Sequence, residues 1–220
     1  MPDVLIVVES TRAKAATQLV SALKHAILTQ CEPDSLTSVD VVSSSDLSAD
    51  TSTLDNRLLC PLTLHLPPIL SLQANALYSA CRDVDGLRQQ LISWQYATGE
   101  GNLWLPIVLT AKGPLYAEVI GFESGAFHSS EQRYKQPIHL SDAQRQPLYA
   151  LSQRLLRSLN ALPAVYLMQF GWQDETLCFD RLLPFPAAPA IASLNVQRPD
   201  LFACHWHCLL GKPIVDLAIV

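Results

Sequence analysis

The sequence predicts a fold of the α/β or α+β class, in which a small strand–helix region precedes an antiparallel sheet with flanking helices. A short apolar run at residues 4–8 is followed by a helical repeat, which is the usual opening of an α/β domain. From residue 100 onward, strand-like runs are paired around turn signals and separated by helical patterns. We therefore expect one region at residues 1–98 and a second at residues 99–220.

The first region begins with a predicted buried strand at Val4–Val8. Ser10 or Thr11 is expected to cap the helix that follows. The apolar residues of this helix recur at helical spacing, at Ala16, Leu19, Val20, Leu23 and Ile27.

A polar stretch at residues 43–53 has little to bury and is expected to form an exposed loop or a partly disordered linker. The strand predicted at residues 58–66 contains Pro61, which favours the edge of a sheet because proline has no N–H to donate. Helical patterns follow at residues 69–82 and 84–95.

The second region opens with a predicted hairpin, whose strands Leu103–Thr110 and Leu115–Phe122 flank an Ala-Lys-Gly-Pro turn. Ser141 and Gln144 have the spacing of a capping box, which marks the start of a helix over residues 141–160. Two further strands are expected at Val165–Phe170 and Leu177–Leu183, around a turn at Trp172–Glu175. The final helix, at residues 199–210, has Pro199 in its first turn and Gly211 just past its end.

Composition argues against several functions. The net charge is −5 and the Arg and Lys residues are scattered, so there is no basic stripe for nucleic acid. No apolar run reaches the roughly 18–20 residues that span a bilayer, and the N-terminus lacks the basic segment of a secretory signal. We expect a cytoplasmic protein whose six cysteines, without a CxxC pair, are reduced and buried.

Three motifs occur in the order and spacing of a known family. They are Met168-Gln-Phe170, Asp180-Arg-Leu-Leu-Pro-Phe-Pro-Ala187, and Leu201-Phe-Ala-Cys-His-Trp206 followed by Leu210-Gly-Lys-Pro213. With them, the stretch from Trp104 to Ile214 resembles the C-terminal half of the ATP-grasp ligases, in particular the carboxyaminoimidazole ribonucleotide synthases of purine biosynthesis. The resemblance implies an ATP-grasp-like antiparallel sheet with flanking helices.

ATP-grasp ligases activate a carboxylate with ATP and magnesium. At several positions where the resemblance expects a residue that binds the metal or a phosphate, this sequence has a different residue type. The family has Glu at Gln169, and Gln is a poorer magnesium ligand. An Asn-Glu pair aligns with Asp180 and Arg181, so a positive charge replaces a carboxylate. A phosphate-contacting Arg aligns with Phe185, and a His aligns with Ala187. The resemblance therefore implies vestigial cofactor-binding positions at Gln169, Asp180 and Arg181, with no bound metal.

The first region lacks the residues of a phosphate cradle. There is no glycine before Gly86 and no lysine between Lys24 and Lys112. Glycine-rich loops and lysines are the groups that approach phosphates in the nucleotide lobe of this family. We therefore expect no nucleotide cofactor, with ATP and magnesium as the alternative.

Other constellations have structural explanations. Cys204, His207 and Cys208 would share one sector of a helix, but no second Cys/His pair stands at zinc-finger spacing, so buried thiols are expected there instead. A Cys–His nucleophile lacks an orienting third group, and the carboxylates of the predicted turn at residues 172–175 are turn formers. The segment Pro184–Pro189 is either an apolar surface for a protein partner or a stiff loop inherited from the family.

Three hypotheses about function follow. The first is a non-catalytic protein that uses an ATP-grasp scaffold as an interaction, assembly or regulatory module, with a protein partner or a second copy of itself. The second is an ATP- and magnesium-dependent carboxylate–amine ligase-like enzyme, or a nucleotide-binding protein, with an altered site around Asp180 and Gln169. The third is one half of a split enzyme whose nucleotide lobe comes from a partner.

Overall fold

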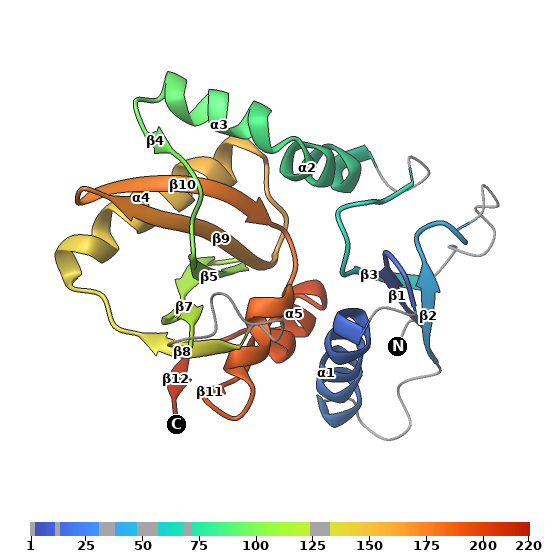
Figure 1. The fold of residues 1–220 in the computed structure, drawn as a ribbon. Helices are drawn as coiled ribbons and strands as arrows, with labels where there is room; N and C mark the ends of the chain where they lie inside the picture. Colours follow the sequence, from blue (N-terminus) through green and yellow to red (C-terminus); the bar gives the residue numbers. More distant parts are fainter. Residues whose placement is uncertain (1–2, 12–13, 31–37, 48–56, 68–71, 124–132) are drawn as a thin grey trace.

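The N-terminal apolar run forms the central strand of a small parallel sheet (Figure 1). The computed structural model describes residues 1–220 except 1–2, 12–13, 31–37, 48–56, 68–71 and 124–132. The elements of this sheet are β1 (Asp3–Val8), α1 (Lys14–Gln30), β2 (Val39–Ser43) and β3 (Arg57–Pro61). The strand order is β2-β1-β3, and both neighbours run parallel to β1. The predicted buried strand and the edge position of the Pro61 strand are confirmed.

The stretch at residues 43–53, predicted to be an exposed loop, begins with buried residues. Ser43 is the last residue of β2 and is buried, and Leu47 is only 9% exposed. Leu47 packs against Leu5 and Val7, on the face of β1 opposite the main core. Between them, Ser45 and Asp46 are exposed and lie in a turn, so only Ser43 and Leu47 depart from the predicted exposed loop, because Leu47 covers this face of β1. Residues 48–53 lie outside the described residues. The cap predicted at Ser10 or Thr11 borders residues that are not described and stays a prediction.

The second sheet has seven strands in the order β4-β10-β9-β5-β7-β8, with β6 pairing with β5. The strands are β4 (Ala97–Thr98), β5 (Leu103–Thr110), β6 (Gly113–Tyr116), β7 (Val119–Phe122), β8 (Tyr134–Ile138), β9 (Ala164–Gln173) and β10 (Thr176–Leu183). Every pairing is antiparallel except that of β10 with the short β4. A short two-stranded sheet of β11 (Gln197–Arg198) and β12 (Ala218–Ile219) completes the chain.

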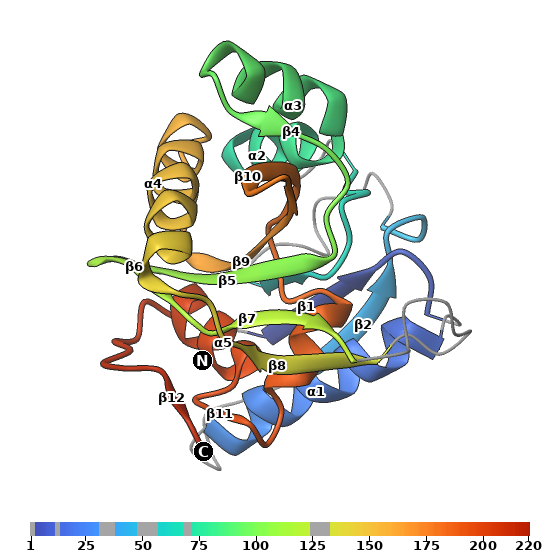
Figure 2. The ribbon, with the colours of Figure 1, turned by 60° about the vertical axis from the view of Figure 1, so that its left-hand side comes forward.

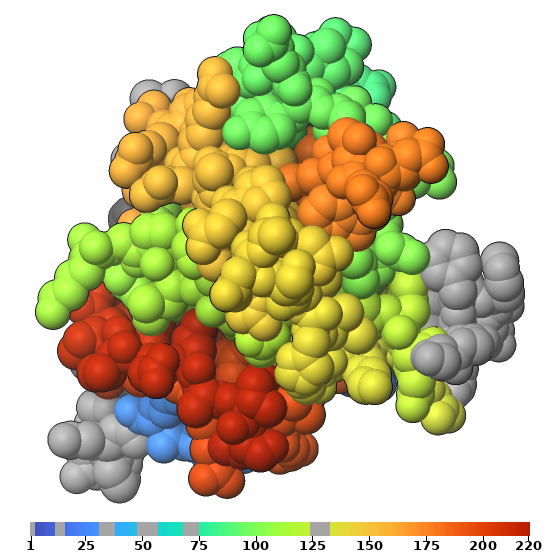
Figure 3. Space-filling view, turned by 90° about the vertical axis from the view of Figure 1, so that its left-hand side faces the viewer, coloured from blue at the N-terminus to red at the C-terminus, as the bar shows by residue number. Residues whose placement is uncertain are grey.

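Helices cover both faces of the second sheet (Figure 2). The helices are α2 (Leu72–Arg82), α3 (Val84–Ser93), α4 (Asp142–Ser158), α5 (Leu201–Leu209) and the 3₁₀ helix η2 (Ala188–Ser193). α2, α3 and α4 lie on one side of β5, β9 and β10, and α5 lies on the other, next to α1. Figure 3 shows α4 in the middle of one face of the molecule. Within the described residues, no helix combines the length and the apolar composition needed to cross a membrane.

Several predicted strand boundaries differ in the structure. The strand predicted at residues 58–66 ends at Pro61, and the strand predicted at Val165–Phe170 extends over Ala164–Gln173. The strand predicted at Leu115–Phe122 is split into β6 and β7, and the side chain of Glu118 between them binds the Arg145 guanidinium at 3.0 Å. The turn predicted at Trp172–Glu175 is shorter, because Asp174 and Glu175 alone form it. Both turn residues have positive φ, 46° and 66°, which matches the twist of a two-residue hairpin loop.

The caps of the later helices are close to those predicted. Gln144 Oε1 accepts from the Ser141 N–H at 3.0 Å, as expected for a capping box. The final helix begins at Leu201, since the Asp200 carboxylate caps it by accepting the N–H groups of residues 202 and 203, both at 2.9 Å. Pro199 therefore precedes the cap and does not lie in the first turn. Gly211 has a φ of 64°, which ends the helix as predicted.

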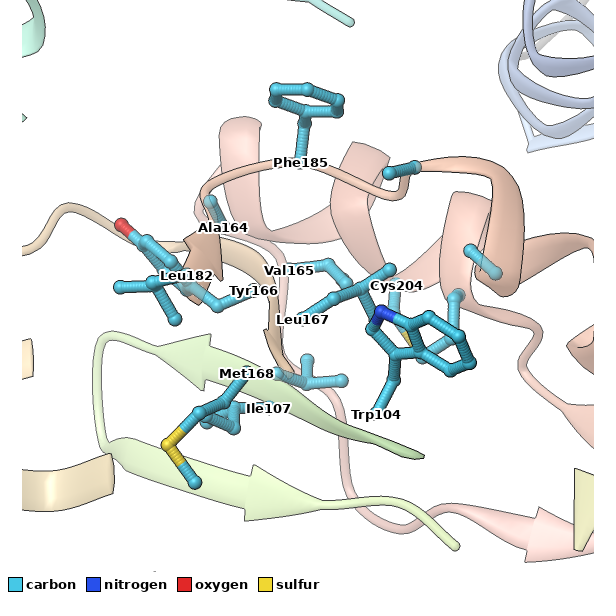
Figure 4. Packing of buried hydrophobic residues seen from close by; sticks show 14 of the residues in the cluster. Trp104, Ile107, Ala164, Val165, Tyr166, Leu167, Met168, Leu182, Phe185 and Cys204 are labelled. Carbon is cyan, nitrogen blue, oxygen red and sulfur yellow. The ribbon is translucent and has the colours of Figure 1, made fainter. Parts of the chain in front are cut away.

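The main core is one continuous cluster that includes buried residues of both sheets, and it is separate from the small cluster of Leu5, Val7 and Leu47. Val165 and Leu167 of β9 face α5, while Met168 and Ile107 lie on the opposite side (Figure 4). All four are 0% exposed, because helices cover both faces of β9. The apolar residues of α1, including Leu23, belong to the same cluster. The boundary at residue 98 stays a prediction.

We predict that Leu23→Ala lowers the free energy of unfolding by about 2–5 kcal/mol, because Leu23 is fully buried and the substitution leaves a cavity. Leu28→Ala on the same helix is the matched control, since Leu28 is 60% exposed, and it should change stability by less than about 0.5 kcal/mol. Urea denaturation of both variants checks this. Equal effects would contradict the packing of α1 against the core.

Candidate functional site

The structure brings Gln169, Asp180 and Arg181 together on two neighbouring strands. Gln169 lies on β9 and the other two lie on β10, and Gln169 pairs with Arg181 in the ladder. The ladder shifts between Phe179 and Arg181, so Asp180 is the extra residue of a β-bulge. A bulge re-aims the side chain of its extra residue. Here Asp180 is 2% exposed, whereas Arg181 points outward and its side chain is 45% exposed.

The buried Asp180 carboxylate is engaged on both oxygens by groups of the protein. Its Oδ1 accepts from Arg88 of α3 at 2.7 Å and from the Arg181 Nε at 3.2 Å. Its Oδ2 accepts from the Gly101 backbone N–H at 3.0 Å. Arg88 also donates its Nε to the Asp180 carbonyl oxygen at 3.1 Å, so this guanidinium holds both the side chain and the backbone of the bulge. Such charge-assisted bonds are the strong ones in a protein interior.

Gly101 links the predicted residues to one another. Its carbonyl oxygen accepts from the Gln169 Nε2 at 2.6 Å, while its N–H binds Asp180. A Cβ at Gly101 would collide with the backbone of Phe170, so only glycine permits this approach to β9. The Gln169 side-chain amide therefore donates to the backbone carbonyl of Gly101, next to β9.

The segment Pro184–Pro189 is packed into the core. Phe185 is 5% exposed and stacks on Tyr78 of α2, with ring centroids 6.3 Å apart and planes 12° apart. The Tyr78 hydroxyl donates to the Pro184 carbonyl oxygen at 3.3 Å, and Ala187 is 9% exposed. The interpretation of this segment as an exposed surface for a partner protein is therefore wrong, because its apolar side chains are covered by neighbouring helices.

These residues do not fit a magnesium-bound triphosphate. Magnesium needs carboxylate or phosphate oxygens with free lone pairs, and the Asp180 oxygens face two guanidinium groups and an N–H. Gln169 contributes no charge, and the side chains at Phe185 and Ala187 are buried and apolar. Among the described residues, no cluster of three or more His, Cys, Asp or Glu side chains could hold a metal ion.

The Cys204–Cys208 segment of α5 is part of the core. Cys204 and Cys208 are buried free thiols, and burial raises the pKa of Cys208 to about 12 and that of Cys204 further, which disfavours the thiolate needed by a nucleophile or a metal. His205 is 1% exposed, and its Nδ1 accepts from the Val165 N–H at 3.2 Å. The five cysteines within the described chain are free and buried, as expected.

Known proteins share this architecture. Glycinamide-RNase-transformylase T from Mycobacterium tuberculosis superposes with a TM-score of 0.74 at 17% sequence identity, over 99% of this chain and 82% of that one. N5-carboxyaminoimidazole ribonucleotide synthetase from Thermotoga maritima gives a TM-score of 0.71 at 8% identity, over 98% of this chain and 77% of that one. These neighbours are ATP-grasp proteins, and the chain has an ATP-grasp-like fold, as the motifs predicted.

A curated sequence relative agrees. The formate-dependent phosphoribosylglycinamide formyltransferase of Haloquadratum walsbyi is 26% identical over 122 residues, which are 54% of this chain. The match spans 29% of the length of that protein. No protein-family model matches the chain. The similarity to ATP-grasp proteins of purine biosynthesis is thus seen in both sequence and fold.

Sequence analysis missed two residues of the cluster, Arg88 and Gly101. Arg88 is separated from Asp180 by 92 positions, and one sequence carries no signal for such a distant pair. The pattern Gly99-Glu-Gly101 was a usable signal, because closely spaced glycines mark a close backbone approach.

We predict that Arg88→Met lowers the free energy of unfolding by about 2–4 kcal/mol, because it leaves the buried Asp180 carboxylate with fewer charged partners. Arg82→Met is the matched control, since Arg82 ends α2 in an exposed position and should contribute less than about 0.5 kcal/mol. Chemical denaturation measures both. If Arg88→Met left the free energy of unfolding unchanged, the ion pair would not hold the bulge.

We also predict that the free energy of unfolding decreases as the pH is lowered, because of His205. Burial lowers the pKa of His205 from 6.5 to about 3, so below pH 6.5 the unfolded chain takes up a proton that the folded chain excludes. Above pH 6.5 His205 therefore costs the folded state nothing. As the pH falls below 6.5 the free energy of unfolding decreases, by about 2 kcal/mol at pH 5. Denaturation at pH 7 and at pH 5 should show that the free energy of unfolding decreases less in His205→Asn than in the wild-type chain. Identical losses would contradict a buried neutral imidazole.

Proposed function

We propose that this chain is a non-catalytic protein that uses its ATP-grasp-like scaffold as an interaction, assembly or regulatory module, without a nucleotide or metal cofactor. The observation that carries the proposal is the engagement of the Asp180 carboxylate by Arg88, Arg181 and the Gly101 N–H. Asp180 stands where the family resemblance expects a metal-side residue. Two guanidinium groups now provide the positive charge that a magnesium ion would supply.

The surroundings support the same conclusion. Removing Arg88 from Asp180 to admit a metal would expose a buried charge and break two hydrogen bonds to one residue. The position where the family has a phosphate-contacting Arg holds Phe185, whose ring is stacked on Tyr78. A cationic side chain for a triphosphate is therefore lacking at Phe185, and a carboxylate with free oxygens for a metal is lacking at Asp180. We interpret Gln169, Asp180 and Arg181 as vestigial ligand positions that now stabilise the fold.

A partner of this module is expected to be a protein or a second copy of the chain. With catalytic ligands replaced by structural bonds, binding is the activity left to the scaffold. We expect it to act in the cytoplasm, as inferred from the sequence.

The second candidate is a nucleotide-binding or ligase-like protein, alone or as half of a split enzyme. It is favoured by the fold, because N5-carboxyaminoimidazole synthetase from Staphylococcus aureus, complexed with ADP, superposes with a TM-score of 0.68 at 9% identity. In that case the nucleotide would have to bind without the Asp180 carboxylate, or after Arg88 had moved away from it.

We predict that Mg-ATP and Mg-ADP leave the melting temperature of the chain unchanged, with inorganic phosphate as the control for weak anion binding. A specific nucleotide at 100 times its dissociation constant would add about 2.7 kcal/mol, which a thermal melt detects readily. Stabilisation by Mg-ATP but not by phosphate would overturn the proposal and favour the second candidate.

The partner is tested on the full chain purified from its native cells. Light scattering of the pure chain identifies a homo-oligomer, and mass spectrometry of co-purifying proteins identifies a different partner. The proposal predicts a complex without ATP hydrolysis. A partner that carries a glycine-rich nucleotide lobe, and a complex that hydrolyses ATP, would support the split enzyme instead.

A further inference from the structure

β3 is an edge strand of the first sheet, and the backbone groups along its outer edge are unpaired. The Leu62 N–H, just after the strand, donates to the Val7 carbonyl oxygen at 2.8 Å and so points toward β1. Because backbone groups alternate in direction along a strand, those of Arg57, Leu59 and Pro61 point away from β1. Within the described part of the chain, these outward N–H and C=O groups have no hydrogen-bond partner. The edge therefore offers both donors and acceptors to an added strand.

An apolar groove with a volume of about 290 Å³ lies along this edge. Leu58 packs with the main core and Leu59 with the small cluster on the opposite face of the sheet, yet both line the groove. Since successive side chains leave a strand on opposite faces, a space that both of them line lies at the edge of the strand. The other walls include Leu77, Leu162 and Leu209. The β3 residues that line the groove are partly exposed, so a binding partner can reach them.

The described side chains that line the groove provide no free charge. The Arg57 guanidinium is paired with Asp40 at 3.0 Å. The hydroxyls of Tyr78 and Tyr166 donate to backbone carbonyl oxygens at 3.3 Å and 2.6 Å. His205 is buried, and burial lowers its pKa to about 3, so it is neutral at pH 7. A charged group would lose its hydration here without gaining a counter-charge, so the groove is complementary to an uncharged occupant.

We propose that this groove binds an extended, uncharged segment of a partner protein, which adds a strand to the outer edge of β3 and inserts apolar side chains into the groove. In this mode of recognition, backbone hydrogen bonds supply affinity and alternate side chains supply specificity. A small apolar molecule would fill the groove but leave the backbone groups of the edge unpaired. The inference rests on the proposed function, because it names the kind of partner that the interaction module takes.

The test uses the capped peptide acetyl-Gly-Ser-Val-Leu-Val-Ser-Gly-amide, which is uncharged and apolar at its centre. The matched control peptide has the same side chains, but the amide nitrogens of its leucine and of the following valine are methylated, which blocks both edges of the peptide. Binding to the full chain is followed by NMR titration. The unmodified peptide is expected to bind saturably and at least about tenfold more tightly than the control, because methylation removes hydrogen bonds to β3.

Amide hydrogen exchange locates the bound peptide. At saturation with the unmodified peptide, the outward Leu59 N–H is expected to exchange at least about tenfold more slowly, because the added strand covers it. The Leu58 N–H points toward β1 and is the internal control, since its exchange should slow by a smaller factor.

Two variants of Leu59 test the role of its N–H. Leu59→Pro removes this group without breaking a hydrogen bond to β1, and it should weaken peptide binding at least about tenfold. Leu59→Val keeps the N–H and should bind the peptide nearly as well as the wild-type chain. Thermal melts identify a variant that fails to fold, and the comparison of the two peptides on the wild-type chain needs no variant.

Equal affinity for the two peptides, no saturable binding, or binding without protection of the Leu59 N–H would overturn the proposal. A chain that self-associates, with this N–H already protected in the oligomer, would overturn it in favour of a second copy as the occupant. The experiment contains no nucleotide, so its failure leaves the proposed function standing, whereas stabilisation by Mg-ATP would overturn the proposed function whatever the peptides do.

Discussion

The engagement of one buried carboxylate sets the character of this molecule. Asp180 projects from a bulge into a place that would be costly for an unpaired charge, and Arg88, Arg181 and the Gly101 N–H compensate it. This cluster joins α3, the segment before β5 and both strands of the central hairpin. In the proposed function, Asp180 therefore holds protein elements to one another. Its carboxylate oxygens cannot coordinate a metal while Arg88, Arg181 and the Gly101 N–H occupy them.

The architecture follows from patterns that act over short distances. The period of apolar residues predicted β1, α1, α4 and α5 with boundaries within a few residues, because buried faces repeat at the spacing of each element. The capping box at Ser141 and the glycine after α5 were equally local signals. Errors arose where a single distant contact decided the outcome. Leu47 is buried because it covers β1, and the strand after Gly113 is split where Glu118 turns to Arg145.

The candidate site was predicted only in part, for the same reason. The motifs placed Gln169, Asp180 and Arg181, and the structure brings these three side by side. Arg88, the residue that decides what Asp180 does, comes from a helix far away in the sequence, and a cation on a helix surface has many possible partners. The burial of the proline-rich segment likewise depends on tertiary contacts without a local signature, among them the stacking of Phe185 on the Tyr78 ring of α2 and the packing of η2 against α1 and α5.

The most direct measurement of the central claim is a crystal structure of the chain after soaking with ATP and manganese, whose anomalous scattering locates the ion. The account predicts no anomalous peak beside Asp180, with the Arg88 guanidinium still bound to its carboxylate. A manganese peak coordinated by Asp180 and by the phosphates of an ordered nucleotide, with Arg88 displaced, would contradict it.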